Sequence, residues 1–207
     1  MIGQAEEPIK LLRRVLAKAT TVWMRSTYHF CQFGKGTSVD FSCDISKKIA
    51  NRVCLGARVY LAPDVWLNVP QDSQGSGPAI MLGDGCQIGR RSMISAKNLI
   101  RLEEDVLLAP SVLLMDHNHE YANVDQPIHM QGTTSGGKIT IGRNCWLGYN
   151  AVIFCGAGHL TLGRNSVVGA NAVVTTSFPP YSVIAGNPAR LIKSFDLATN
   201  NWKRASS

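Results

Sequence analysis

The stretch ITIGRNCWLGYNAVI, residues 139–153, places Ile141, Leu147 and Ile153 at intervals of six. A spacing of six matches neither the 3.6-residue period of a helix nor the two-residue alternation of a long strand. It is typical of a short strand followed by a tight turn, repeated along the chain. The stretch therefore predicts a repeat fold built from six-residue units.

The same spacing continues on both sides of this stretch, from residue 55 to residue 174. Sixteen positions fall into five registers, and every one of them holds Leu, Ile or Val. The registers are Leu55, Leu61 and Leu67; Leu82, Ile88, Ile94 and Ile100; Leu102, Leu108 and Leu114; Ile141, Leu147 and Ile153; and Leu162, Val168 and Val174. Such a run predicts a column of aliphatic side chains inside a stack of coils.

Two further positions of each unit are small. The residue after the aliphatic one is often Gly or Ala, and we expect these glycines to relieve backbone strain at the corners of the coils. The fifth position holds mostly small or β-branched residues, namely Val59, Val65, Cys86, Ser92, Val106, Val112, Cys145, Ala151, Ala157, Ser166 and Ala172. Each unit thus carries one large and one small inward residue, and three units close one triangular coil.

These repeats resemble those of the hexapeptide-repeat acyltransferases. The stretch at 139–153, the following LGRNSVVGANAVVT (162–175) and IAGNPARLI (184–192) are most similar to the branch of sugar and polysaccharide O-acetyltransferases. The resemblance covers about residues 50–192. It implies a left-handed parallel β-helix and a homotrimer with active sites between its subunits. It also implies acetyl-CoA as the acyl donor, a sugar or polysaccharide acceptor and no metal.

The length of 207 residues fits one domain with small appendages. We expect a mainly β chain with a basic amphipathic helix within residues 1–35. The β-helix, a triangular prism, should span residues 36–192. A short helical cap over residues 193–207 should cover the last coil, because terminal repeats need polar caps.

Insertions interrupt the repeat at residues 70–79 and 115–138. About three extra residues between Ile153 and Leu162 bring His159 with them. Because the regular faces of a solenoid are structural, insertions are the places where we expect function. The loop at 70–79 carries no recognisable chemistry, whereas the loop at 115–138 holds three of the five histidines.

The N-terminal segment has the features of a helix. Glu6 and Glu7 precede Pro8, and Pro is tolerated in a first turn. Apolar residues then follow at spacings of three and four, namely Leu12, Val15, Leu16, Ala19, Val22 and Trp23, together with the basic Lys10, Arg13, Arg14, Lys18 and Arg25. Two interpretations remain open: the helix packs on the prism or on a neighbouring subunit, or it docks on an anionic membrane surface.

The charge distribution counts against nucleic-acid binding. The chain has a net charge of +7, of which residues 1–35 contribute +4 and residues 190–207 contribute +3. The middle is therefore neutral, whereas a body that binds nucleic acid is basic where it meets phosphate. No apolar run reaches the roughly 18 residues typical of a membrane span.

The six cysteines are scattered without CxxC spacing. A chain of this size does not depend on disulfides for stability. We therefore expect free thiols and a cytoplasmic location, at most peripheral at the inner face of the membrane.

Acyl transfer from a thioester to a hydroxyl needs a base with a pKa near working pH, and histidine is the usual choice. His117 follows the register ending at Leu114, with Asp116 beside it and His119 two residues on. The family resemblance implies that His117, between APSVLL and the later NCWLG hexad, is the catalytic base. His119 and an ordinary polar loop are the alternatives. Asp116 and Glu120 are the candidates for orienting the imidazole.

The resemblance also implies a path for the coenzyme A arm. In the family, the tryptophan at the position of Trp146 lies beside the coenzyme arm or the acceptor, and the arm would pass Tyr149, Ala170 and Thr175. An exterior Trp146 would equally suit a contact between subunits. The family often has a lysine after the threonine, and Thr176 stands there instead. The candidates for the missing phosphate contact are Arg164, Arg190 and Lys193.

The sequence thus predicts an acetyl-CoA-dependent O-acetyltransferase that modifies a sugar hydroxyl, in cell-surface polysaccharide biosynthesis, by direct transfer. The alternatives are an acetyltransferase for a small molecule such as a free sugar, an antibiotic or an amino acid, and a non-catalytic β-helix scaffold. A metal-dependent hydratase on the same prism is a further alternative. It would need three histidine ligands, and His117 and His119 are a poor pair for that purpose.

Overall fold

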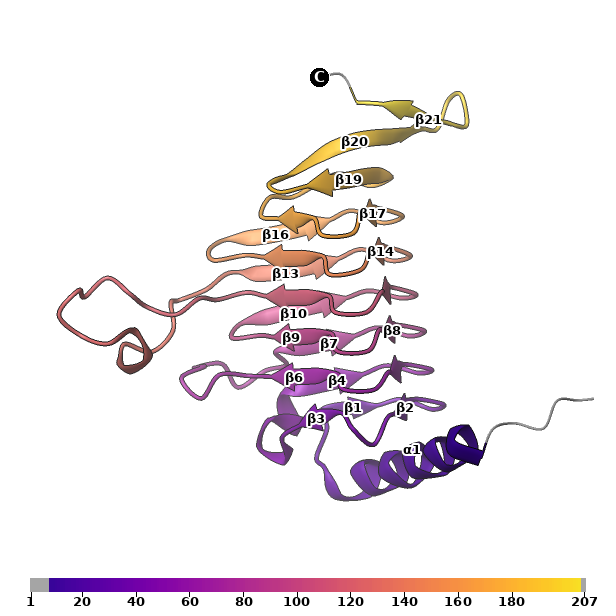
Figure 1. Cartoon of the computed structure of the whole chain (residues 1–207), viewed down its shortest axis with the longest axis vertical. Coiled ribbons are helices and arrows are strands. Elements are labelled where there is room, and N and C mark those ends of the chain that lie inside the picture. Colours follow the sequence, from indigo (N-terminus) through magenta and orange to yellow (C-terminus); the bar gives the residue numbers. More distant parts are fainter. Residues whose placement is uncertain (1–7, 206–207) are drawn as a thin grey trace, which may run out of the picture.

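The computed structural model describes residues 8–205, which form a stack of short coils with one helix at its end (Figure 1). The helix α1 (Pro8–Thr27) lies across the first coil, and the chain then climbs the stack to its C-terminal strands. Glu6 and Glu7, which we expected just before the helix, lie outside the described residues.

Three sheets form the sides of the stack. Sheet A contains, in spatial order, β1 (Gln32–Phe33), β4 (Val53–Leu55), β7 (Ile80–Leu82), β10 (Leu99–Leu102), β13 (Lys138–Ile141) and β16 (His159–Leu162). Sheet B contains β2 (Ser38–Val39), β5 (Tyr60–Leu61), β8 (Gln87–Ile88), β11 (Leu107–Leu108), β14 (Trp146–Leu147), β17 (Val167–Val168), β19 (Ser182–Gly186), β20 (Ala189–Asp196) and β21 (Asn201–Arg204). Sheet C contains β3 (Asp44–Ile45), β6 (Trp66–Asn68), β9 (Met93–Ser95), β12 (Leu113–Met115), β15 (Val152–Phe154) and β18 (Val173–Val174).

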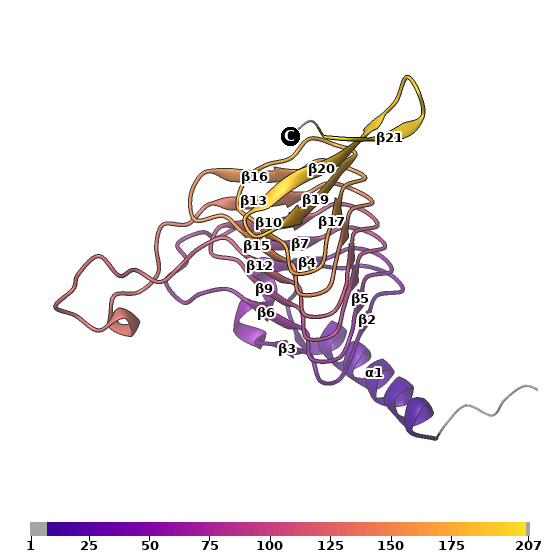
Figure 2. The ribbon, with the colours of Figure 1, turned by 45° about the horizontal axis from the view of Figure 1, so that its top comes forward.

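The coils stack in parallel register. Leu108, for example, pairs with Ile88 on one side and with Leu147 on the other. The chain visits sheets A, B and C in turn, so that each coil is a triangle (Figure 2). This is the parallel β-helix that the six-residue period predicts, and it is consistent with the left-handed winding that the family resemblance implies.

The predicted core is confirmed. All sixteen aliphatic positions of the five registers are at most 2% exposed. Ten of the eleven predicted small positions are buried as well, including Cys86, Ser92 and Cys145. Ala157 is the exception, because the extra residues before β16 carry it onto the surface, and Cys155 is buried in that coil instead.

The role expected for the repeat glycines is wrong. Those that follow the aliphatic residue, such as Gly142, are not among the residues with positive φ. A Cβ on Gly142 would come within 2.5 Å of the backbone nitrogen of Arg164 in the next coil, so the glycine is needed for close approach between coils. The left-handed position comes two residues later, at Asn144 and Asn165 for example, since Asn tolerates that conformation.

The expected helical cap is also wrong, because strands occupy that segment. β20 runs antiparallel to β19, and β21 pairs antiparallel with β20. Phe195 packs against Trp202 with ring centroids 5.3 Å apart. Extending sheet B satisfies the backbone groups at the last coil without a helix.

The expectation that all cysteines are free fails for one pair. Cys31 and Cys54 form a disulfide, with their Cα atoms 4.9 Å apart. β1 pairs with β4 so that Gln32 lies opposite Cys54, which brings residues 23 positions apart together. The other four cysteines are free: Cys43, Cys86, Cys145 and Cys155.

The helix α1 does not bury the apolar stripe that the sequence shows. Met24 is its one buried residue. Leu12, Val15 and Val22 are between 55% and 65% exposed. The helix therefore packs on the prism, as one interpretation expected, but through Met24 and Thr21 and not through its apolar stripe.

Candidate active site

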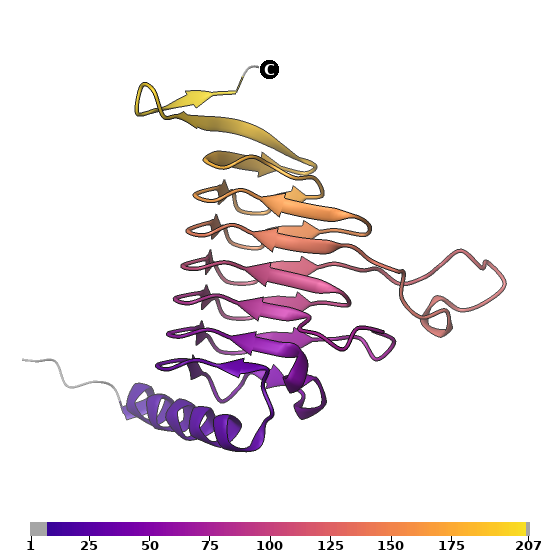
Figure 3. The same ribbon diagram turned by 180° about the vertical axis from the view of Figure 1, so that it is seen from behind.

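The insertions all lie at one corner of the triangle. The connections from sheet C to the next strand of sheet A include the 3₁₀ helix η1 (Lys47–Arg52), the loop at 70–79 and the long loop that contains η2 (Ile128–Met130). Figure 3 shows the longer loops projecting from the same side of the stack. The corner between sheets C and A, the C–A corner below, is therefore where side chains other than those of the regular repeat gather.

His117 and Asp116 form a pair at the base of the long loop. They follow β12 directly, and Nδ1 of His117 lies 3.0 Å from Oδ1 of Asp116. Asp116 is fully buried and His117 is 6% exposed. Neighbouring side chains often point apart, but here the chain leaves the strand at this point and both turn to the same side.

The backbone of the coil below fixes the carboxylate. Oδ1 of Asp116 accepts a hydrogen bond from the backbone N–H of Lys97 at 2.7 Å, and Oδ2 accepts from Asn98 and Leu99 at 2.9 and 3.0 Å. Three successive N–H groups thus cradle the carboxylate. Asp116 is held in one orientation, and it holds the imidazole ring in turn.

The other imidazole nitrogen is left for a reaction partner. Among the described residues, no buried side-chain nitrogen or oxygen lacks a hydrogen-bond partner, and Asp116 is the one side chain bonded to His117. Nε2 therefore reaches accessible space. A hollow of about 380 Å³ opens there, lined by Trp66, Asn68, Pro70, Met93, Ser95, Met115, His117, His119 and Thr133. A histidine with one nitrogen fixed and the other facing a hollow can accept a proton from a bound hydroxyl.

A polar cluster ties the two loops of this corner together. The ammonium of Lys97 lies 3.0 Å from Asp72 Oδ2 and 2.8 Å from Thr133 Oγ1. The hydroxyl of Thr133 donates to Asp72, which also accepts from the Thr133 backbone N–H. Although partial burial raises the pKa of Asp72, the hydrogen bonds from Thr133 and Lys97 outweigh it and lower that pKa to about 2.

Lys97 therefore connects this cluster to the catalytic candidates. Its side chain holds Asp72 and Thr133, and its backbone N–H binds Asp116. Sequence reasoning missed this role, because it found no chemistry in the loop at 70–79. The signal for the hollow is the alignment of successive six-residue units. It places Asn68, Ser95 and Met115 beside one another at the ends of neighbouring strands of sheet C.

The other polar residues considered from the sequence, His119, Glu120 and His159, form no hydrogen bond with the Asp116–His117 pair. His119 is exposed, lines the hollow, and forms an isolated antiparallel β-bridge with Thr133 through its backbone. Glu120 accepts hydrogen bonds from the backbone N–H groups of Tyr121 and Ala122, so Asp116, and not Glu120, contacts His117. His159 lies on β16, where its Nε2 is 2.8 Å from Thr140 Oγ1.

The residues expected along the coenzyme arm are not gathered within one chain. Thr175 and Thr176 follow β18 at the C–A corner, two strands from β12, which corresponds to about 10 Å along the stack. Tyr149 and Ala170 lie between sheets B and C, and Trp146 is 49% exposed on sheet B, opposite the C–A corner. Arg190 is exposed on β20, where its guanidinium donates to the carbonyl of Ala189.

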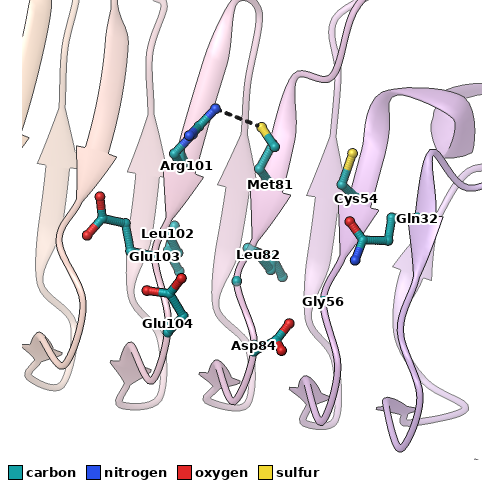
Figure 4. A pocket seen from close by; sticks show the side chains of 11 residues that line it. Gln32, Cys54, Gly56, Met81, Leu82, Asp84, Arg101, Leu102, Glu103 and Glu104 are labelled. Carbon is teal, nitrogen blue, oxygen red and sulfur yellow. Dashed lines mark hydrogen bonds between the residues drawn. The ribbon is translucent and has the colours of Figure 1, made fainter.

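A second hollow, of about 330 Å³, lies on the outer face of sheet A and contains none of the predicted site residues (Figure 4). Three carboxylates line it: those of Asp84, Glu103 and Glu104. Asp84 accepts from the backbone N–H of Ala57, and Glu103 from that of Arg143. These two carboxylates link neighbouring coils. Within residues 8–205, moreover, no three His, Cys, Asp or Glu side chains form a group that could hold a metal ion.

Comparisons with known proteins agree with this architecture. Residues 138–176 match the sequence family described as the hexapeptide repeat of succinyl-transferase. The chain is 32% identical over 140 residues to the putative lipopolysaccharide biosynthesis O-acetyl transferase WbbJ of Escherichia coli (strain K12), an alignment that covers 65% of this chain and 69% of that protein. It is 37% identical over 150 residues to a putative acetyltransferase of Dictyostelium discoideum, with 72% and 71% covered.

Solved structures share the fold at low sequence identity. AntD, an N-acyltransferase from Bacillus cereus solved with dTDP and 3-hydroxybutyryl-CoA, aligns with a TM-score of 0.67 and 15% identity, covering 84% of this chain and 87% of that one. A maltose O-acetyltransferase from Clostridium difficile 630 aligns with a TM-score of 0.51 and 21% identity, covering 92% and 90%. The solved structures thus share the fold, and the family match and the two relatives above show that the chain belongs to the hexapeptide-repeat acyltransferase family and is an acetyltransferase.

Proposed function

We propose that this protein transfers an acetyl group from acetyl-CoA to a hydroxyl of a sugar, with His117 as the general base. The observation that carries the proposal is the buried Asp116–His117 pair, which leaves Nε2 facing a hollow at the corner where the insertions gather. Sugars in the names of the relatives support the acceptor class. The maltose O-acetyltransferase and WbbJ carry the O-acetyl assignment in their names, whereas AntD is an N-acyltransferase.

The proposed reaction is a single displacement. Nε2 of His117 takes the proton of the acceptor hydroxyl as that oxygen attacks the thioester carbonyl carbon. The new carbon–oxygen bond forms, the carbon–sulfur bond breaks, and the imidazolium returns its proton to the departing thiolate. Asp116 keeps the proton on Nδ1 and stabilises the imidazolium through its charge. No covalent acyl-enzyme is needed.

We propose a homotrimer with the sites between subunits. The separation of Trp146 on sheet B from His117 at the C–A corner supports this, because a neighbouring copy is the way to bring an outward sheet B beside that corner. Co-expression of a His117→Ala chain with a Trp146→Ala chain tests it. Sites that combine an intact histidine with an intact tryptophan from another chain would restore part of the activity that each variant alone lacks. Activity no higher than that of either variant would contradict shared sites.

Polysaccharide biosynthesis is our proposal for the biological setting, supported by the name of WbbJ. The inner face of the membrane is the proposed location, since an acyl-CoA donor is found inside the cell. Among residues 8–205, no helix combines the length and apolarity needed to cross a membrane.

A panel of acceptors with acetyl-CoA tests the function directly. Hydroxyl-only sugars and oligosaccharides, amino sugars and small amines are compared by release of the coenzyme A thiol and by mass spectrometry of the product. An increase of 42 mass units that is labile to mild base identifies an O-acetyl ester, because amides resist that treatment. Acetylation confined to amines would contradict the proposal in favour of N-transfer. Binding of acetyl-CoA without transfer to any acceptor would favour a scaffold.

A further inference from the structure

The helix α1 is attached to the prism by the side opposite its apolar residues. Thr21 Oγ1 accepts a hydrogen bond from the backbone N–H of Val39 in the first coil at 2.9 Å. One turn later Met24 enters the core, 4% exposed, and one turn earlier Ala17 is half-buried. The spacing of these three residues defines one face of the helix, and that face is small and partly polar.

The opposite face is apolar and largely exposed, although Trp23 at its end packs edge-on against Tyr28. Its large members are Ile9 (72% exposed), Leu12 (58%), Val15 (55%), Leu16 (39%), Val22 (65%) and Trp23 (55%). A continuous apolar surface of this kind on a soluble body marks an interaction site. In a helix that served only to close the stack, the apolar face would be turned inward.

The charges on the helix α1 have one sign, although Lys10, Arg13 and Arg14 lie on the side toward the prism. α1 carries five Lys or Arg residues and no Asp or Glu. From Pro8 to Tyr60 the chain has ten Lys or Arg and two Asp, whereas the remainder of the chain is close to neutral. Lys18 and Arg25 lie on the helix beside the apolar residues and are exposed. The cationic part of the protein is therefore the end that α1 covers (Figure 1).

We propose that α1 lies flat on an anionic lipid surface, with its apolar face in the headgroup region and with Lys18 and Arg25, which lie beside that face, at the lipid phosphates. A helix of this composition partitions into the interface rather than across the bilayer. Each Lys or Arg near such a surface strengthens the attraction to it. A second copy of the chain is a poorer occupant, because two such faces in contact would bring two strongly cationic helices together.

The position of α1 orients the enzyme on this surface. The helix crosses the end of the stack, so the stack would stand upright on the lipid (Figures 1 and 3). β12, which leads to His117, is three strands above β3 of the first coil, about 14 Å along the axis. The hollow at His117 then faces sideways, above the lipid surface. The membrane contact itself is independent of the proposed reaction and stands without it.

Co-sedimentation of the full chain with lipid vesicles tests the proposal. Vesicles of phosphatidylcholine with 30% phosphatidylglycerol are compared with pure phosphatidylcholine, at 0.1 M and 0.5 M NaCl. We expect binding to the anionic vesicles at low salt and a marked loss at high salt, since screening weakens the phosphate contacts. Lys18→Glu with Arg25→Glu should reduce binding at least about tenfold. Val22→Ser with Trp23→Ser should reduce it as well, because apolar area enters the interface.

Matched control variants distinguish binding through α1 from nonspecific binding through other exposed charged or apolar residues. Arg143→Glu and Val124→Ser, exposed positions away from α1, should bind like the wild type. Circular dichroism and thermal unfolding check that every variant folds. The proposal is overturned by equal binding to both kinds of vesicle, or by no binding to either. It is also overturned if Val22→Ser with Trp23→Ser leaves vesicle binding unchanged but lowers the oligomeric state, since a second copy would then cover this face.

Discussion

Oδ1 of Asp116 lies 3.0 Å from Nδ1 of His117, and three backbone N–H groups of the neighbouring coil hold that carboxylate in place. The pair joins the regular stack to the long loop. The coil below supplies the donors, the strand β12 delivers the aspartate, and the loop begins with the histidine. The rigid repeat thus orients a side chain that a loop alone would leave free to turn.

Replacing Asp116 by Asn tests this orientation. Asn keeps the shape of the side chain but loses the charge. Its NH₂ group is a donor and would face backbone N–H groups that are also donors. We expect Asp116→Asn to lower kcat by about 10²- to 10⁴-fold. The KM for acetyl-CoA should change little. Steady-state kinetics of Glu120→Gln provide the control, since Glu120 binds its own loop. An unchanged kcat in Asp116→Asn would show that the pair does not work together.

The Asp72 cluster predicts an acid-dependent part of stability. The pKa of Asp72 is lowered from 3.8 to about 2 in the folded chain. A group with a lowered folded-state pKa stabilises above its unfolded pKa, and that contribution is lost as pH falls from about 4 to 2. The Tm of the wild type should therefore exceed that of Asp72→Asn at pH 6, and the gap should close toward pH 2.5. Because Asp72 is well exposed to solvent, the gap should be small.

Asp125→Asn, at an exposed position of the long loop at 115–138, is the control for Asp72 and should show no such gap. If Lys97 positions Asp116 as the geometry indicates, Asp72→Asn should also lower kcat more than it raises KM. A gap that persists unchanged at pH 2.5 would contradict the role of the ionised carboxylate.

The aliphatic column predicts large and position-specific losses of stability. Ile88→Ala removes a fully buried side chain from β8 and should cost about 2 to 5 kcal/mol in the free energy of unfolding. Gln87→Ala, one residue earlier on the same strand, changes an exposed side chain and should cost less than about 0.5 kcal/mol. Denaturant unfolding measures both. Equal effects at the two positions would contradict the inward and outward alternation on which the fold depends.

Thiol counting tests the Cys31–Cys54 pair. Protein denatured without reductant should show four thiols to Ellman's reagent, and six after reduction. The native protein should react more slowly, because burial raises the pKa of Cys43 to about 12 and that of Cys86 to about 11. Six thiols in the unreduced, denatured protein would contradict the disulfide.

The sequence predicts the stack well because its signal is local. A single large side chain every six residues specifies which residues point inward, and all sixteen such positions are buried. His117 could be selected for the same reason, since it stands where a regular register stops. The left-handed turn positions at Asn144 and Asn165 follow the same period, and the asparagines there are a signal for that conformation.

Contacts across coils were harder to predict. Asp72 and Thr133 are 61 positions apart, and their hydrogen bonds depend on how many residues each coil uses at the corner. Cys31 and Cys54 meet because β1 aligns with β4 in one register out of several. The side by which α1 attaches to the prism could not be predicted either. Periodicity identifies an apolar face of a helix but not the surface that this face contacts.

The central claim is that Nε2 of His117 removes the acceptor proton, and His117→Ala tests it most directly. With the acceptor identified by the panel, His117→Ala should lower kcat/KM by about 10²- to 10⁴-fold. Its fold and acetyl-CoA affinity should be kept, and His119→Ala, on the rim of the same hollow, should keep most of the activity. A His117→Ala enzyme that transfers acetyl groups at the wild-type rate, or a loss found with His119→Ala instead, would contradict the account.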